Sequence, residues 1–199
     1  GTLNAEGKDV VVIGGGDTAM DCVRTSIRQK AKSVKCLYRR DRENMPGSAR
    51  EVGNAIEEGV DFVWLTSPKS FVGKTIVEAV EVNKMKLGEP DSSGRRRPEI
   101  QVGSDYKIKA DLVIKSLGFD PENLPKLFNA EELAVSKWGT IKIDLKSMQT
   151  NLDGVFAAGD IVRGASLVVW AIRDGRDAAM QIEKYLKTKI SKNKSEVAA

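Results

Sequence analysis

A run of three glycines between a strand pattern and a helix pattern constrains this chain more than any other feature. Residues 9–13 form a short β-branched run typical of a strand buried on both faces of a sheet. Gly14, Gly15 and Gly16 follow directly, and from Asp17 onward apolar residues recur at helical spacing. In that context the run matches the GxGxxG/A pattern of a strand–turn–helix unit that binds dinucleotides.

The chemistry expected of this loop depends on its bare main chain. A glycine has no Cβ, so the backbone can approach a pyrophosphate closely. The free amides and the positive end of the helix dipole at Asp17 and Thr18 attract the negative charge. A tight glycine turn that binds no ligand is the alternative interpretation.

Two arginines stand where the second strand pattern, residues 34–38, comes to its end. The dinucleotide fingerprint usually has an acidic residue near this point, about 20 positions after the glycines, to hold the ribose 2'-hydroxyl. Arg39 and Arg40 can instead bind a 2'-phosphate through charge-assisted, partly bidentate hydrogen bonds. The pair therefore predicts NADPH over NADH, unless both arginines are only solvated charges at a strand end.

A helix is expected after these arginines. Ser48 and Glu51 have the spacing of a capping box, in which each side chain satisfies a free amide of the other's turn. The pattern predicts a helix from this point to about Glu58, ended by Gly59.

Strand patterns complete a first domain. Residues 60–87, including Phe62 and Trp64, alternate in β fashion, and residues 89–98 are typical of a polar turn. Together they predict an antiparallel meander laid on the parallel sheet. A further buried strand is expected at residues 110–114, ending at Gly118, where we place the domain boundary.

The rest of the chain predicts part of a second α/β domain. Residues 139–145 and 154–158 have strand patterns, and residues 166–186 have a helix pattern. The second strand pattern ends in Gly159 and Asp160, and an acid at such a tip can accept hydrogen bonds from sugar-alcohol hydroxyls. An aspartate that only caps a turn is the alternative. Residues 188–199 are expected to form a flexible tail.

Four blocks of sequence together resemble the small (beta) subunits of NADPH-dependent glutamate synthases. They are GGGDTAMDC from Gly14, YRRD from Tyr38, NMPGS from Asn44 and AAGD from Ala157. The resemblance extends from about Gly7 to Leu186, and the NMPGS block and the LVVWAI stretch from Leu167 are particular to that family. Thioredoxin reductases are similar in three of these features but carry a CxxC pair, which this sequence lacks.

The resemblance implies a Rossmann-like NADPH-binding domain, residues 1–118, inserted into an FAD-binding Rossmann-like domain whose C-terminal part is residues 119–187. It implies that Asp160 meets the ribitol of the flavin and that the amides near Val169 and Trp170 meet the isoalloxazine. Gly118 and Gly159 belong to the same expected set of cofactor-binding positions. The loop for the ADP part of FAD and the cysteines for iron-sulfur clusters precede this region in the family, so we expect the chain to be a fragment.

The resemblance also implies a function. In the parent protein a hydride passes from NADPH to FAD, and electrons pass onward to a large (alpha) subunit for glutamate synthesis. Similar proteins serve other large subunits or ferredoxin, so the final acceptor stays open. The alternatives are an isolated NADP(H)-binding module without activity of its own, and a related reductase of the ferredoxin-NADP or thioredoxin-reductase type.

Composition argues against several other functions. Among 199 residues there is no histidine, so we expect no catalytic side chain and no metal site. Cys22 and Cys36 have neither metal nor redox spacing. No stretch approaches the roughly 18 consecutive apolar residues of a membrane helix. The net charge of +4 is spread along the chain, and the arginines at 95–97 lack interleaved aromatic residues, so we expect a cytoplasmic protein without membrane or nucleic-acid partners.

Overall fold

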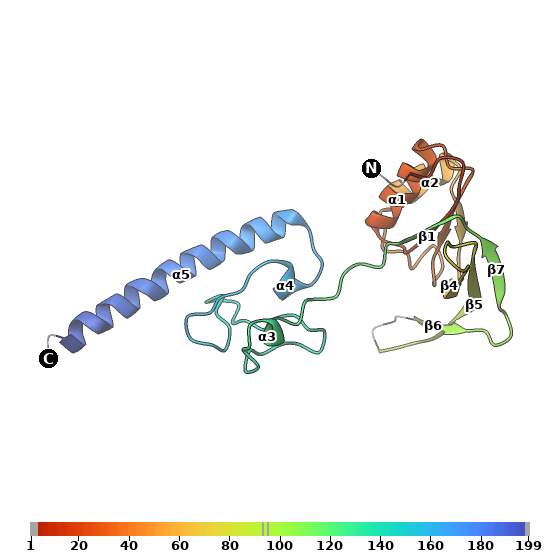
Figure 1. Ribbon diagram of the computed structural model, residues 1–199. Coiled ribbons are helices and arrows are strands. Elements are labelled where there is room, and N and C mark those ends of the chain that lie inside the picture. Colours follow the sequence, from red (N-terminus) through yellow and green to blue (C-terminus); the bar gives the residue numbers. More distant parts are fainter. Residues whose placement is uncertain (1–3, 93, 95, 198–199) are drawn as a thin grey trace. The chain divides into compact units, whose positions relative to one another are not determined.

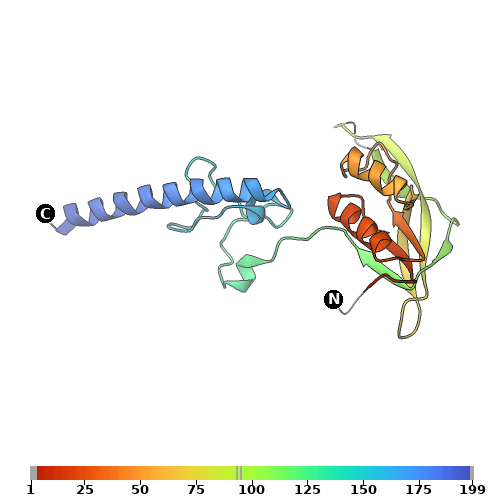
Figure 2. The same cartoon turned by 90° about the horizontal axis from the view of Figure 1, so that it is seen from above.

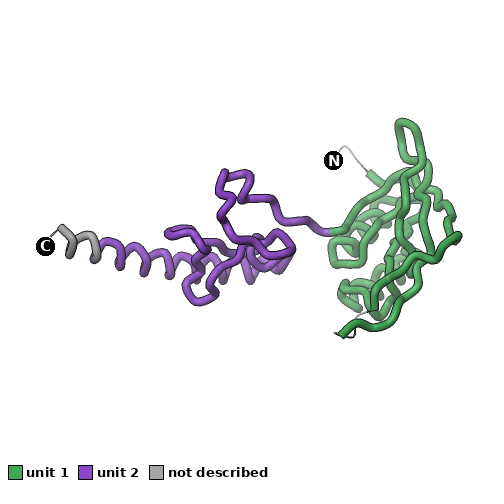
Figure 3. The backbone as a smooth tube through the Cα atoms, turned by 90° about the horizontal axis from the view of Figure 1, so that it is seen from below, with its two compact units in different colours: residues 1–117 green, residues 118–199 purple. Residues whose placement is uncertain are grey.

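The computed structural model describes residues 4–92, 94 and 96–197. The chain divides into two compact units, residues 1–117 and residues 118–199 (Figures 1 and 3). Each unit has its own architecture and is described by itself.

A parallel sheet forms the centre of the first unit. Its strands are β1 (Asp9–Ile13), β2 (Ser33–Leu37), β3 (Asp61–Val63) and β8 (Leu112–Lys115), in the order β3-β2-β1-β8. All three pairings are parallel, and β1 has a strand on each side. Every residue of β1 is buried, as its β-branched run predicts.

Two helices cover one face of this sheet. They are α1 (Asp17–Arg28) and α2 (Ala49–Glu57) (Figure 2). Their buried residues, among them Met20, Val23 and Val52, pack against Val10 and Val12 of β1 in one core cluster. Burial of these apolar side chains is the main stabilising contribution of this layer.

An antiparallel sheet covers the other face. It consists of β4 (Thr66–Val72), β5 (Ala79–Pro90), β6 (Arg96–Ile100) and β7 (Tyr106–Lys109). The long strand β5 pairs with β4 on one side and with both β6 and β7 on the other. Its inward side chains pack against β1 and β2 in a second core cluster of Val11, Ile13, Leu37, Val80, Val82 and Ile108. The predicted α/β Rossmann-like fold with an antiparallel layer is confirmed.

The predicted meander was wrong at both of its ends. Phe62 lies in β3, which pairs with β2 in the parallel sheet, because the strand–helix–strand connection through α2 places it there. Trp64 follows β3 and stacks on Phe62 with 4.9 Å between ring centroids. The polar turn expected at residues 89–98 is shorter, because β5 continues to Pro90 and β6 begins at Arg96. Arg95, the first of the three arginines, lies outside the described residues.

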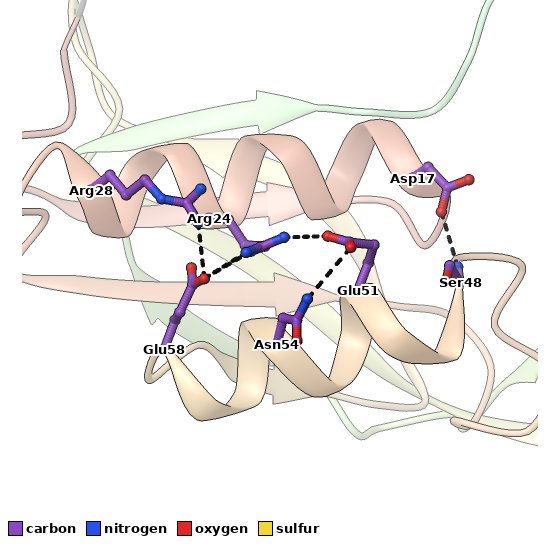
Figure 4. Close-up of polar contacts among 7 residues, drawn as sticks. All are labelled: Asp17, Arg24, Arg28, Ser48, Glu51, Asn54 and Glu58. Carbon is purple, nitrogen blue, oxygen red and sulfur yellow. Dashed lines mark hydrogen bonds and ion pairs between the residues drawn. The ribbon is translucent and has the colours of Figure 1, made fainter.

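The predicted capping box is also absent. Ser48 is the N-cap of α2, but its side chain makes no capping hydrogen bond. Glu51 instead pairs with Arg24 of α1, and Glu58 accepts hydrogen bonds from Arg24 and Arg28 (Figure 4). A charge-assisted bond to a guanidinium is stronger than a bond to a neutral amide, so Arg24 draws the glutamate away from the helix end.

The second unit contains helices α3 (Leu124–Leu127), α4 (Asp160–Arg163) and α5 (Val168–Val197). The two strands predicted at residues 139–145 and 154–158 are reduced to isolated bridges, Val135–Ile141 and Gln149–Phe156. A strand needs a neighbouring strand to bond with its backbone groups, and the described part of this unit contains no β-ladder to supply one.

Helix α5 continues well beyond Leu186, where the sequence predicts its end and the start of a tail. No glycine or proline follows Leu186 to interrupt it. An ion pair of 2.6 Å between Glu183 and Lys187, one turn apart, supports the continuation.

Candidate functional site

A cavity of about 480 Å³ lies at the carboxyl ends of β1, β2 and β8. Parallel strands place such ends at one edge of the sheet, which is where open α/β sheets bind ligands. The three glycines line the cavity after β1, and Arg39 and Arg40 line it after β2. All of its lining residues belong to the first unit.

The three glycines of this loop have different reasons to lack a side chain. A Cβ on Gly14 would lie 2.2 Å from the carbonyl oxygen of Ser116, and a Cβ on Gly15 would lie 2.4 Å from the ring of Tyr38. A Cβ on Gly16 would meet nothing within 4 Å. The first two glycines are therefore required for packing, whereas Gly16 leaves open space in front of the loop.

Helix α1 starts at this open space. Gly16 is its N-cap and provides no side-chain capping bond. Amides in the first turn of an α-helix have no acceptor within the helix, and the helix dipole adds partial positive charge there. Thr18 is exposed in this turn, and the carboxylate of Asp17 accepts a hydrogen bond of 2.9 Å from the Ser48 amide.

Positive charge at the cavity comes from Arg39, which is exposed, and Arg40, which is half-buried. Among the described residues neither side chain has an ion pair or hydrogen-bond partner, and Nε of Arg40 is buried without one. A buried polar atom without a partner carries a free-energy cost of about 1–3 kcal/mol. An anion bound beside these arginines would remove that cost, so the arrangement suits a phosphate group.

The segment of residues 41–48 forms another wall, which we call the NMPGS loop. The Gly47 amide donates to the Gly15 carbonyl oxygen at 2.8 Å, and the Tyr38 hydroxyl donates to the Asn44 carbonyl oxygen at 2.7 Å. Pro46 lines the cavity. This loop carries part of the family resemblance, but sequence reasoning did not assign it to the site.

Further lining residues were missed as well. The cavity is also lined by Tyr38, Pro46, Thr66, Ser67, Pro68, Ser116 and Leu117. Ser116 follows β8 at the carboxyl edge of the sheet, so its position after a predicted strand was a usable signal. Thr66, Ser67 and Pro68 come from β4, and their arrival at this edge depends on how the second sheet folds over the first.

Cys36 is buried behind the glycine loop. Its thiol points to the Gly14 carbonyl oxygen at a distance of 3.5 Å. Burial raises the pKa of the Cys36 thiol to about 12, because a thiolate would lose its hydration. Within the described residues there is also no cluster of three side chains that could hold a metal ion.

The remaining predicted site residues lie in the second unit. Gly118 is the first residue of this unit, and Asp160 is exposed at the start of α4. Gly159 before it has φ of +77°, a conformation that favours glycine. Val169 and Trp170 lie in the first turn of α5, where the Trp170 amide already donates to the Leu167 carbonyl oxygen at 2.9 Å.

Asp174 connects these two parts of the second unit. Its carboxylate, 4% exposed, accepts hydrogen bonds from Nε and Nη2 of Arg163 at 2.5 and 2.7 Å. The Arg163 guanidinium holds the pKa of Asp174 below its usual range. The same guanidinium lies over the Trp170 ring, 5.2 Å from its centroid. The turn at Asp160 and the start of α5 are therefore held together by side chains.

In the part of the chain that the structure describes, no helix is both long enough and apolar enough to cross a membrane.

Comparisons with known proteins match nearly the whole chain. The model of the pyridine nucleotide-disulphide oxidoreductase family matches residues 2–175. The chain is 62% identical over 189 residues to the glutamate synthase (NADPH) small chain of Azospirillum brasilense, covering 95% of this chain and 39% of that protein. It is 66% identical over 184 residues to the putative glutamate synthase (NADPH) small chain of Cereibacter sphaeroides, covering 92% and 45%.

The chain therefore spans less than half the length of these curated relatives. Among solved structures, FprA from Mycobacterium tuberculosis in complex with NADPH has a similar fold, with a TM-score of 0.76 and 18% identity. That likeness covers 96% of this chain and 55% of FprA.

Proposed function

Because the chain belongs to the pyridine nucleotide-disulphide oxidoreductase family, we propose that residues 1–118 form an NADPH-binding domain. The diphosphate rests on Gly14, Gly15 and Gly16 and on the first amides of α1, at Asp17 and Thr18. The 2'-phosphate binds between Arg39 and Arg40.

The buried, unpartnered Nε of Arg40 is the observation that carries this proposal. In a cavity next to a bare glycine loop, an uncompensated guanidinium favours a ligand with an additional negative group on that side. NADPH has such a group and NADH does not. A turn without a ligand would leave the cost of the buried Nε unexplained.

Calorimetric titration of the chain with NADPH and NADH tests the proposal. Replacing Arg39→Glu together with Arg40→Ala should weaken NADPH binding by about 100-fold and NADH binding by less than about threefold. Lys84→Glu with Lys107→Ala is the matched control, because it removes the same net charge from two exposed lysines that do not line the cavity. Equal losses for both dinucleotides, or no binding by the unmodified chain, would contradict the proposal.

We propose further that the chain is the NADPH:flavin oxidoreductase portion of a glutamate synthase small subunit, as the names of its relatives suggest. When bound, NADPH supplies a hydride and FAD accepts it, and the chain positions both. Residues 119–187 would be the C-terminal part of the FAD-binding domain. The parent protein would pass electrons through iron-sulfur clusters to a large subunit.

In this proposal five residues of the second unit hold the flavin. Asp160 accepts hydrogen bonds from ribitol hydroxyls, and its exposed carboxylate is available for that role. The start of α5 faces the isoalloxazine, with the Val169 amide as the donor, since the Trp170 amide is already bonded to Leu167. Gly118, Gly159 and Trp170 complete the set.

A second candidate is an NADP(H)-binding module without activity of its own. It is favoured by the second unit, whose described residues form no β-ladder and in which Leu167, Val168 and Val169 are 65%, 71% and 59% exposed. The colour of the purified chain distinguishes the two. Yellow protein that bleaches with NADPH supports the oxidoreductase, and colourless protein that enhances NADPH fluorescence supports the module.

A further inference from the structure

Asp17 has a contact in the structure that the sequence did not predict. It is the first residue of α1, and its Oδ1 accepts a hydrogen bond of 2.9 Å from the amide of Ser48 at the start of α2 (Figure 4). Thirty-one positions separate the two residues. The bond therefore connects the glycine loop and its helix to the far end of the NMPGS loop.

The adjacent residue of the NMPGS loop is fastened to the same place. The Gly47 amide donates to the Gly15 carbonyl oxygen at 2.8 Å, so two consecutive amides are held by the glycine loop and the first residue of α1. A Cβ on Gly47 would lie 3.0 Å from that oxygen, which shows how closely the two segments approach. Pro46, the next residue toward the amino terminus, lines the cavity.

The other end of the loop is held independently of Asp17. The Tyr38 hydroxyl donates to the Asn44 carbonyl oxygen at 2.7 Å, and Asp41 Oδ1 accepts from the Asn44 amide at 3.0 Å. Pro46 therefore lies between two anchored points. Loss of the Asp17 bond would leave the carboxyl-terminal end of the loop fastened to the glycine loop by the Gly47 amide alone, while the other end stays attached.

The charge of Asp17 works against its use as a ligand for the dinucleotide. A carboxylate in the first turn of α1 is stabilised by the helix dipole, but it repels the diphosphate proposed to bind at the same helix end. Its bond to Ser48 occupies one carboxylate oxygen with a donor from the protein. The residue's acceptor atom is useful there, whereas its negative charge opposes binding.

We propose that the Asp17 side chain positions the NMPGS loop at the cavity and that its carboxylate, unlike the main-chain amide of the same residue, does not bind the dinucleotide. This inference rests on the proposed NADPH-binding function and revises the expectation that Asp17 contacts the cofactor. Two substitutions separate the acceptor atom of Asp17 from its charge. Asparagine keeps an acceptor for the Ser48 amide and lacks the charge, whereas alanine lacks both.

The test is a comparison of Asp17→Asn and Asp17→Ala by calorimetric titration with NADPH. The asparagine variant should bind about threefold more tightly, because the repulsion is gone and the loop stays anchored. The alanine variant should bind about tenfold more weakly, because loss of the charge does not make up for a loosened loop. Asp21→Asn and Asp21→Ala, at an exposed position one turn along α1, are the matched controls and should differ little from each other.

Limited trypsin digestion of the ligand-free variants reads out the loop itself. Arg50 lies two residues after Ser48, in the first turn of α2, and is exposed, so it reports whether the Ser48 end of the NMPGS loop is held. Cleavage there should be faster in Asp17→Ala than in the unmodified chain, and unchanged in Asp17→Asn and in both Asp21 variants. A chain that binds no dinucleotide would contradict the proposed function, while the digestion would still decide whether Asp17 anchors the loop.

Two results would overturn the inference. If the alanine and asparagine variants shift NADPH affinity in the same direction by similar factors, Asp17 acts through its charge or as a direct ligand. If Arg50 is cleaved at the same rate in all variants, Asp17 does not hold the loop.

Discussion

The two units differ in how completely their backbone and apolar groups find partners. In the first unit every strand is paired, and two core clusters bury the apolar side chains on both faces of the parallel sheet. In the second unit the described residues form two isolated bridges, and large apolar side chains such as Phe119 and Trp138 are 94% and 73% exposed. The first unit thus contains the elements of a stable fold, while the second carries strand patterns without strands.

The difference shows that a strand pattern in the sequence is not enough to form a strand, because the backbone also needs neighbouring strands. Residues 10–13 and residues 154–158 are both short apolar runs that are followed by a glycine. The first run lies between β2 and β8 and is entirely buried, whereas Val155 in the second is 39% exposed. The first run has neighbouring strands to pair with and the second has none among the described residues.

The largest expected effect comes from one substitution made in each unit. Met20→Ala should lower the free energy of unfolding by about 3 kcal/mol, because Met20 is 1% exposed and its loss leaves a cavity between α1 and the sheet. Met180→Ala, at a side chain that is 54% exposed in α5, should change it by less than about 0.5 kcal/mol. Urea unfolding followed by circular dichroism measures both.

If both substitutions lowered the free energy of unfolding by the same amount, the two units would not differ in how well their apolar side chains are packed. Such a result would mean that Met180 is covered in the folded protein, for instance by a second copy of the chain. If only Met20→Ala lowers the free energy of unfolding, the first unit accounts for the stability of the chain.

Sequence reasoning found the parts of the site that depend on local chemistry. The glycine loop and the double arginine line the same cavity at the carboxyl edge of the sheet, because both patterns directly follow parallel strands that are close in sequence. The walls made by the NMPGS loop and by β4 were not found. Those walls depend on contacts such as Gly47 with Gly15, between segments that share no local pattern.

The errors have the same origin. Ser48 and Glu51 have the spacing of a capping box, yet Arg24, on another helix, pairs with Glu51. Phe62 has the alternation of a meander strand, yet its pairing partner is β2. In each case local propensity was overridden by a tertiary contact, which a single sequence does not display.

A smaller effect is expected from the carboxylate that fastens the amino ends of β1 and β2. Asp9 accepts a hydrogen bond from Ser33 at 2.8 Å and forms an ion pair with Lys109 at 2.8 Å. These contacts, with a further pair to Lys32, lower the pKa of Asp9 from 3.8 to about 2. Since both lysines are exposed, the stabilisation is about 1 to 2 kcal/mol.

This stabilisation should depend on pH in one direction. Because the folded-state pKa lies below the unfolded value, the contribution is fully present above about pH 4 and is lost as the pH falls through about 2. Asp9→Asn should therefore be less stable than the unmodified chain at pH 7, and its deficit should shrink steadily between about pH 4 and pH 2, by urea unfolding. Asp61→Asn, at an exposed carboxylate paired with Lys35, is the control. A deficit of Asp9→Asn that persists unchanged at low pH would show that packing, and not charge, is responsible.

The smallest effect is expected in the second unit, from Asp174→Ala. Removing this carboxylate frees Arg163, which holds the turn at Asp160 against the start of α5, so amides of α4 and the first turns of α5 should exchange hydrogen about tenfold faster. Hydrogen exchange read by mass spectrometry localises the change. Asp153→Ala removes an exposed pair with Lys189 and should leave those amides unaffected. Amides of β1 should keep their protection in both variants, because β1 belongs to the other compact unit. Faster exchange in β1 would mean that the two units stabilise each other and open as one cooperative structure.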